Sequence, residues 1–193
     1  MTFSQLIHQE NLRLATHSLI HYSHWITPEA REKRYDTHFF LALVPEGQTP
    51  SADQKETTAG IWLTPQQALK ANISGDIPLT PPALCMLEEL TPFSSADNIV
   101  GFARTRSMSD PILPILTTIN GYETLLLSKD ELYAAYVGKE KQNDNKPDKS
   151  VRIILKNGRW FPSLPSRVEW EKVGSQPQTD WSVQTNYPAE RAG

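Results

Sequence analysis

The most regular alternation of polar and apolar positions lies in residues 35–44. In a strand, one face of this segment would carry Tyr35, Phe39, Leu41 and Leu43. The opposite face starts polar and becomes apolar, in the order Asp36, His38, Phe40, Ala42, Val44. Such a strand is expected to run from an exposed edge or site into a covered interior.

Shorter patterns around this strand predict further elements of an α/β domain. Strands are predicted over Leu19–Ile26 and Ala59–Leu63. Three helices are predicted to begin at Thr2, Thr64 and Thr80. Glutamines follow Thr2 and Thr64 at the capping-box position, and Gly75 should end the second helix.

The pattern changes after Pro92, where two β-hairpins are predicted. Each has an Asn-Gly turn, and their strands span Ile115–Ile119, Tyr122–Leu127, Val151–Lys156 and Arg159–Phe161. Ser128 with Glu131 should cap a short helix through Tyr136. We therefore expect an α+β domain in residues 1–92, a hairpin-rich extension in 93–173 with a polar linker at 139–150, and a disordered tail in 174–193.

Composition argues against several classes of partner. The formal charge of −3 and pI near 6.0 give no general attraction to nucleic acid or to an anionic membrane. Cys85 is the single cysteine of the chain, which excludes an internal disulfide framework and suits a reducing compartment. It lies among apolar residues and is expected to be a core residue. A cytoplasmic location is the expectation.

Several phrases in residues 22–65 occur together in one known family. They are Trp-Ile-Thr-Pro at 25–28, Arg-Tyr-Asp-Thr-His-Phe-Phe-Leu-Ala at 34–42, Pro-Glu-Gly-Gln at 45–48 and Trp-Leu-Thr-Pro at 62–65. In this order they resemble the coenzyme A diphosphatase-like branch of the Nudix hydrolases, from Phe3 to about Leu90. The resemblance implies a Nudix-like mixed sheet with flanking helices and hydrolysis of diphosphate-linked nucleotide derivatives, with coenzyme A-like substrates favoured.

The Nudix box of this family, GX5EX7REUXEEXGU, has no copy in the printed sequence. In the family its glutamates bind Mg²⁺ or Mn²⁺, which take oxygen ligands. Only Gly138, Asp144 and Arg152 fall at matching positions, Ile153 stands where a glutamate is needed, and Pro147 interrupts any helix there. We expect the box to lie before Met1, so that the domain is N-terminally incomplete. The chain would then be a fragment or inactive as given, and the alternative is a non-catalytic nucleotide-binding or interaction module.

Four residues are candidates for a site in the part that is present. Glu56 could act as general base or additional metal ligand, as late-loop acids do in some Nudix enzymes, or be an exposed loop residue. Trp25 and Trp62 could stack on a nucleotide base, or pack in the core. Arg34 could bind a phosphate, or belong to a solvated run of charges.

The histidines near residue 20 are not expected to share a metal ion. Strict alternation along a strand puts His21 and His24 on opposite faces. His17 and His21 share a face but would stand about 13 Å apart. No metal ligands are therefore assigned in this chain.

The expected partner is a nucleotide-type small molecule. Without the strands that the family places before the box, the sheet would also keep an exposed edge. The chain is then expected to be marginally stable, to form a homodimer through that edge, or to cover it with the C-terminal hairpins.

Overall fold

The computed structural model describes residues 1–55, 57, 59–107, 110–137 and 152–162. Its elements are α1 (Phe3–Gln9), η1 (Thr16–Ser18), β1 (Ile20–Ile26), β2 (Asp36–Leu41), α2 (Pro65–Ser74), α3 (Pro81–Leu90), α4 (Ala96–Thr105), β3 (Ile115–Ile119), β4 (Tyr122–Leu126), α5 (Glu131–Tyr136), β5 (Arg152–Lys156) and β6 (Arg159–Pro162). The predicted linker at 139–150 and tail at 174–193 lie outside the described residues.

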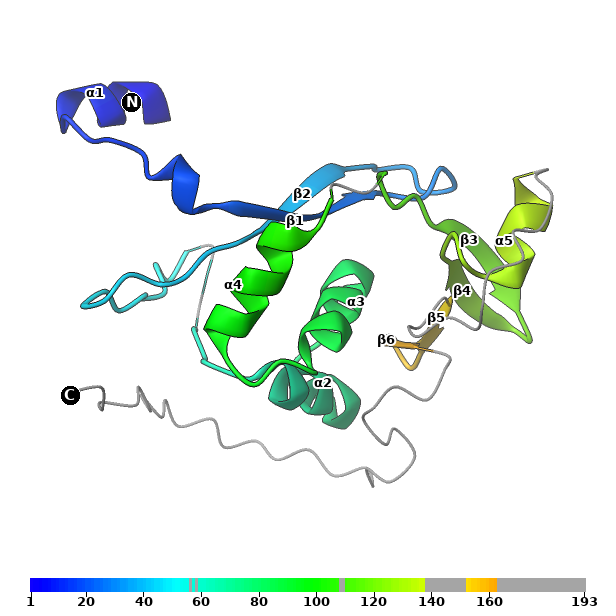
Figure 1. Ribbon diagram of the computed structural model, residues 1–193. Coiled ribbons are helices and arrows are strands. Elements are labelled where there is room, and N and C mark those ends of the chain that lie inside the picture. Colours follow the sequence, from blue (N-terminus) through cyan, green and yellow to red (C-terminus); the bar gives the residue numbers. More distant parts are fainter. Residues whose placement is uncertain (56, 58, 108–109, 138–151, 163–193) are drawn as a thin grey trace.

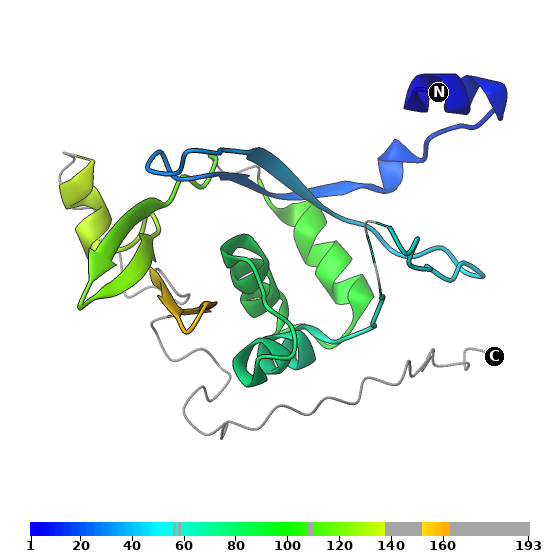
Figure 2. The ribbon, with the colours of Figure 1, turned by 180° about the vertical axis from the view of Figure 1, so that it is seen from behind.

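The strands form two antiparallel sheets. β1 pairs with β2, and the other sheet has the order β3-β4-β5-β6. Helices α3 and α4 lie beneath the β1–β2 pair, and the four-stranded sheet stands beyond α3 (Figures 1 and 2). The α+β class expected from the sequence is confirmed.

Helix starts and hairpin turns follow their local sequences. Thr2 and Thr64 each accept a hydrogen bond from the backbone N–H of a glutamine three residues on, whose side chain accepts one in return. Gly75, at φ +94°, ends α2 in the left-handed conformation that favours glycine. Both Asn-Gly turns have positive φ at both residues, which matches the twist of the strands they join.

Two local expectations about strands differ from the structure. Residues 59–63 form no strand, and Ile61 and Trp62 are exposed. β2 ends at Leu41, and Phe40, Leu43 and Val44 are exposed, so this strand does not enter a covered interior. In the described part of the chain, no partner strand lies beside residues 42–44 or 59–63. Without a partner, these residues gain nothing from an extended, buried conformation.

The start of α5 also differs. Its N-cap is Asp130, which accepts a hydrogen bond from the Leu132 N–H at 2.9 Å, so the expected cap at Ser128 is wrong. Asp130 is buried and accepts two hydrogen bonds from the Arg152 guanidinium, at 2.8 and 2.9 Å. This contact with β5 fixes the carboxylate at the helix start, and local sequence gives no sign of it.

The hydrophobic core joins the two sides of residue 92. Leu69 and Leu84, from α2 and α3, pack with Leu125 and Ile153, from the four-stranded sheet. The second cluster contains Tyr22, Leu90 and Ala103, from β1, α3 and α4. Helix α4, which the sequence analysis did not assign, therefore covers one face of the β1–β2 pair (Figure 1).

A β-bulge changes which residues share a face of β1. His21 lies opposite Phe40, Ser23 opposite Phe39, and His24 opposite His38, so Tyr22 is an extra residue. Tyr22 and Trp25 are both buried. The expectation that His21 and His24 face opposite ways is wrong, because the extra residue shifts the alternation and both rings contact His38.

No helix among the described residues combines the length and the apolar character that crossing a bilayer requires.

Candidate functional site

A cleft of about 220 Å³ lies where the β1–β2 pair, the start of α3 and the four-stranded sheet meet. Its walls are mainly apolar, and include Trp25, Phe39, Pro81, Pro82, Leu125 and Trp160. These residues come from segments far apart in the sequence, so the cleft depends on the docking of the hairpin sheet. Apolar walls with few polar groups are typical of small-molecule sites.

Arg31 is the charged side chain among the described residues that line the cleft. It lies in the turn between β1 and β2, and its guanidinium donates to the Glu123 carboxylate on β4. The two side chains are 44% and 33% exposed, so this ion pair contributes little to stability. An anion in the cleft could therefore compete with Glu123 for Arg31.

Of the predicted site residues, the structure describes Trp25, Arg34 and Trp62, and these three lie in different surroundings. Trp25 lines the cleft, and its indole N–H donates to the Ser23 hydroxyl at 2.9 Å. Arg34 is exposed, and its Nε donates to the Thr27 carbonyl at 3.0 Å, which steadies the turn beside the cleft. Trp62 is 54% exposed and is not a lining residue. Glu56 lies outside the described residues, so its role stays a prediction.

Among the predicted site residues that the structure describes, only Trp25 lines the cleft, and the lining residues Arg31 and Trp160 were not proposed from the sequence. Arg31 belongs to a charged turn, where a solvated position is the usual expectation. Trp160 follows an ordinary Asn-Gly turn, and its position is fixed by the Asn72 side chain, which donates to the Trp160 carbonyl at 3.0 Å. Such a long-range contact has no local signal in the sequence.

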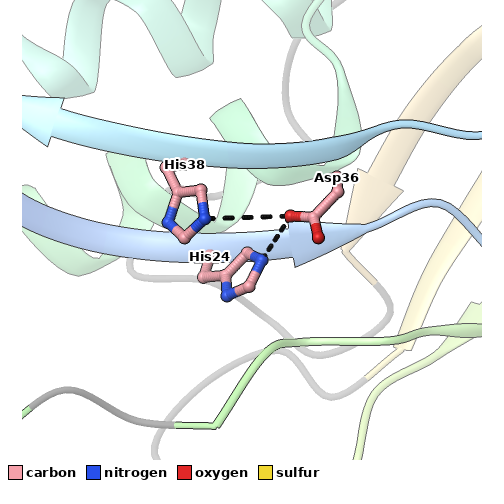
Figure 3. A group of neighbouring side chains, drawn as sticks. All are labelled: His24, Asp36 and His38. Carbon is pink, nitrogen blue, oxygen red and sulfur yellow. Dashed lines mark hydrogen bonds and ion pairs between the residues drawn. The ribbon is translucent and has the colours of Figure 1, made fainter.

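A second group of side chains lies on the opposite face of the β1–β2 pair, around Asp36 (Figure 3). His24 Nε2 is 2.5 Å from Asp36 Oδ1, and His38 Nε2 is 3.8 Å from the same oxygen. The His24 and His38 rings are stacked with centroids 3.9 Å apart, and His21 Nε2 lies 2.9 Å from His38 Nδ1. Ligand atoms of His24, Asp36 and His38 all lie within 4.8 Å of one another.

Tyr22 belongs to the core beneath the strands. The Arg106 guanidinium lies 4.8 Å from the centre of its ring and pairs with Glu89 at 2.8 Å. Burial, followed by the nearby Glu89 carboxylate, raises the pKa of Tyr22 above its usual range. The phenol is therefore neutral in the folded chain and acts as a packing group.

Comparison with known proteins identifies the N-terminal part. Residues 1–90 match the family model of the NUDT19 Nudix domain. These residues are similar to the coenzyme A diphosphatase-like branch of the Nudix superfamily. The resemblance stated from the Trp-Ile-Thr-Pro and Trp-Leu-Thr-Pro phrases is thereby confirmed.

Curated relatives extend the match beyond residue 90. The chain is 35% identical over 156 residues to the acyl-coenzyme A diphosphatase NUDT19 of Gallus gallus, covering 75% of this chain and 40% of the relative. It is 29% identical over 162 residues to the protein of the same description in Homo sapiens, with coverages of 78% and 43%. The chain thus spans about two fifths of the length of these relatives. No solved structure matches it.

The metal ions of the Nudix family do not fit the residues at hand. Mg²⁺ and Mn²⁺ prefer several carboxylate, carbonyl or water oxygens. Within the described ranges, the one group of three or more metal-ligating side chains is His24, Asp36 and His38, which offers two imidazoles and one carboxylate. That set does not resemble a glutamate-rich Nudix centre.

Proposed function

We propose that this chain supplies the substrate-binding part of a Nudix-type diphosphatase that acts on coenzyme A-like molecules. The observation that carries the proposal is the match of residues 1–90 to the NUDT19 Nudix domain, with curated relatives described as acyl-coenzyme A diphosphatases. The reaction would be hydrolysis, in which water attacks one phosphorus of the diphosphate and the P–O–P bridge breaks.

The cleft beside Trp25 is the proposed place for the substrate. Its apolar walls suit an acyl or pantetheine chain, and Arg31 at the same cleft suits a phosphate. Arg34 lies in the same turn and adds a second positive charge nearby. A coenzyme A-type ligand combines an apolar arm with a diphosphate, so it matches both features of the cleft.

Catalysis would need metal-binding glutamates from residues outside the printed sequence, since it contains no Nudix box. On this proposal the chain by itself binds the substrate and does not cleave it. Glu56 would contribute to the complete site as general base or additional ligand.

The experiment is a hydrolysis assay with the purified full chain. The substrates are coenzyme A, an acyl-coenzyme A, ADP-ribose and a dinucleoside polyphosphate, each with Mg²⁺, with Mn²⁺ and with EDTA. The proposal predicts no cleavage by a chain shown to be folded, and saturable binding of the coenzyme A-type ligands. Metal-dependent cleavage that disappears in Glu56→Gln would contradict it, because the chain would then hold a complete site. Binding of every nucleotide with equal affinity would favour the non-catalytic nucleotide-binding module.

A further inference from the structure

The outer face of the β1–β2 pair brings together His24 from one strand and Asp36 and His38 from the other (Figure 3). We propose that these three side chains bind one Zn²⁺ ion. The site is separate from the cleft, which lies on the opposite face of the same strands, and it does not depend on the function proposed above.

The spacing of the ligand atoms suits a single ion. Zn²⁺ lies about 2.0–2.2 Å from imidazole nitrogen and carboxylate oxygen, so two ligands of one tetrahedral ion stand roughly 3.3 Å apart. The two contacts to Asp36 Oδ1, 2.5 Å from His24 Nε2 and 3.8 Å from His38 Nε2, bracket that separation. Asp36 and His38 are 65% and 46% exposed on their side chains, so they have room to rotate toward the ion, with the His38 ring tilting out of its stack on His24.

The types of ligand decide between metals. Imidazole nitrogen suits zinc and other late transition metals, whereas Mg²⁺ and Ca²⁺ take oxygen ligands. Two imidazoles and one carboxylate make three protein ligands, and the fourth position of a zinc ion would then be taken by water or another small ligand.

His21 supports this assignment through a hydrogen bond to the proposed ligand His38. Its Nε2 lies 2.9 Å from His38 Nδ1, so a proton on His38 Nδ1 can be donated to it. That tautomer leaves the lone pair of His38 Nε2 on the side of Asp36, where the ion would bind. The Phe40 and His21 rings also pack in a T-shaped arrangement, with centroids 5.4 Å apart. A histidine ligand whose second nitrogen is hydrogen-bonded is the usual arrangement in metal sites.

A bound ion would connect the two strands. A two-stranded sheet is only marginally stable without help. Because His24 lies on β1 while Asp36 and His38 lie on β2, one zinc ion would cross-link the pair beside the turn at residues 27–35. Zinc should therefore raise the melting temperature of the chain as well as bind to it.

The test is a zinc titration of the tag-free full chain after treatment with a chelator, at slightly alkaline pH where imidazoles bind metals. Calorimetry should give one equivalent of Zn²⁺, and Co²⁺ in its place should give the visible absorption bands of a tetrahedral site. His38→Ala and Asp36→Asn should each lower the affinity at least tenfold, and His21→Ala by about tenfold.

The matched control is His17→Ala, which removes an exposed histidine on η1 outside the cluster. It should leave the affinity unchanged. Circular dichroism of each variant verifies that it is folded. The proposal fails if the wild-type chain binds no zinc at about 100 µM, if Asp36→Asn binds as tightly as wild type, or if His17→Ala loses as much affinity as His38→Ala.

Discussion

Replacing Asn72 by alanine should destabilise the folded chain by about 1.5–3.5 kcal/mol. Asn72 is fully buried on α2. Its Oδ1 accepts a hydrogen bond from the Leu79 N–H at 2.9 Å, and its Nδ2 donates to the Trp160 carbonyl at 3.0 Å. The side chain thus joins α2 both to the segment before α3 and to the strand that carries a wall of the cleft.

The magnitude follows from the two backbone groups that alanine would leave without a partner. Each buried group left unsatisfied costs about 1–3 kcal/mol. The two costs add up to about 2–6 kcal/mol. Leu79 and Trp160 are half-buried, so water can reach their backbone groups in part, and the combined cost should be about 2–4 kcal/mol. Alanine also favours the helix by roughly 0.5 kcal/mol over asparagine. These contributions leave a net loss of about 1.5–3.5 kcal/mol.

The assay is urea unfolding at equilibrium, followed by tryptophan fluorescence. The midpoint of Asn72→Ala should fall while the m value stays near that of wild type. The control is Asn98→Ala, the same change at an exposed position of α4, which should shift stability by no more than about 0.5 kcal/mol. A loss in Asn72→Ala no larger than in this control would show that the Asn72 contacts do not hold the hairpin sheet to α2.

Three further predictions address the core, the edge and the pH dependence. Above about pH 10, Tyr22 is ionised in the unfolded chain but neutral in the folded chain, so the free energy of unfolding should fall as pH rises. In urea unfolding, Tyr22→Phe should reduce this alkaline decline, and an unchanged decline would contradict the burial argument. Arg152→Met should cost about 3–5 kcal/mol in the same assay, because it leaves the Asp130 carboxylate buried without its cation, whereas a loss below about 1 kcal/mol would mean that water replaces the arginine. We also propose that the segment after β2 pairs with a second copy of the chain; light scattering should then give a dimer that Leu43→Lys converts to a monomer, and a wild-type monomer would refute it.

Local signals in the sequence predicted the elements whose cause is local. The capping boxes at Thr2 and Thr64 and the Asn-Gly turns act within a few residues, and the structure has each of them. The cap of α5 was misassigned to Ser128 because the choice of Asp130 depends on Arg152, a residue on β5. The strand expected at 59–63 has no partner strand among the described residues. An alternating sequence pattern does not stabilise a strand that has no partner to pair with.

The histidine cluster and the cleft were predicted even less well, because both depend on contacts between residues far apart in the sequence. One extra residue, Tyr22, places His21 and His24 on one face, and nothing in the alternation of β1 signals such a bulge. The cleft residues Trp25 and Trp160 meet only because Asn72 and the core around Leu125 hold the two halves together. Family phrases identified the Nudix segment, but they carry no information on a cleft that the hairpin sheet completes.

The proposed substrate site is tested most directly by the binding of coenzyme A to the full chain, measured by calorimetry for wild type and for Trp160→Ala. Trp160 lines the cleft from β6 and lies outside residues 1–90, so this variant leaves the family segment unchanged. Placing the substrate in this cleft predicts saturable binding by wild type and at least a tenfold loss in the variant, with the fold of the variant shown to be intact by circular dichroism. Equal affinity in the two proteins, or no binding by a folded wild-type chain, would contradict the assignment of this cleft as the substrate site.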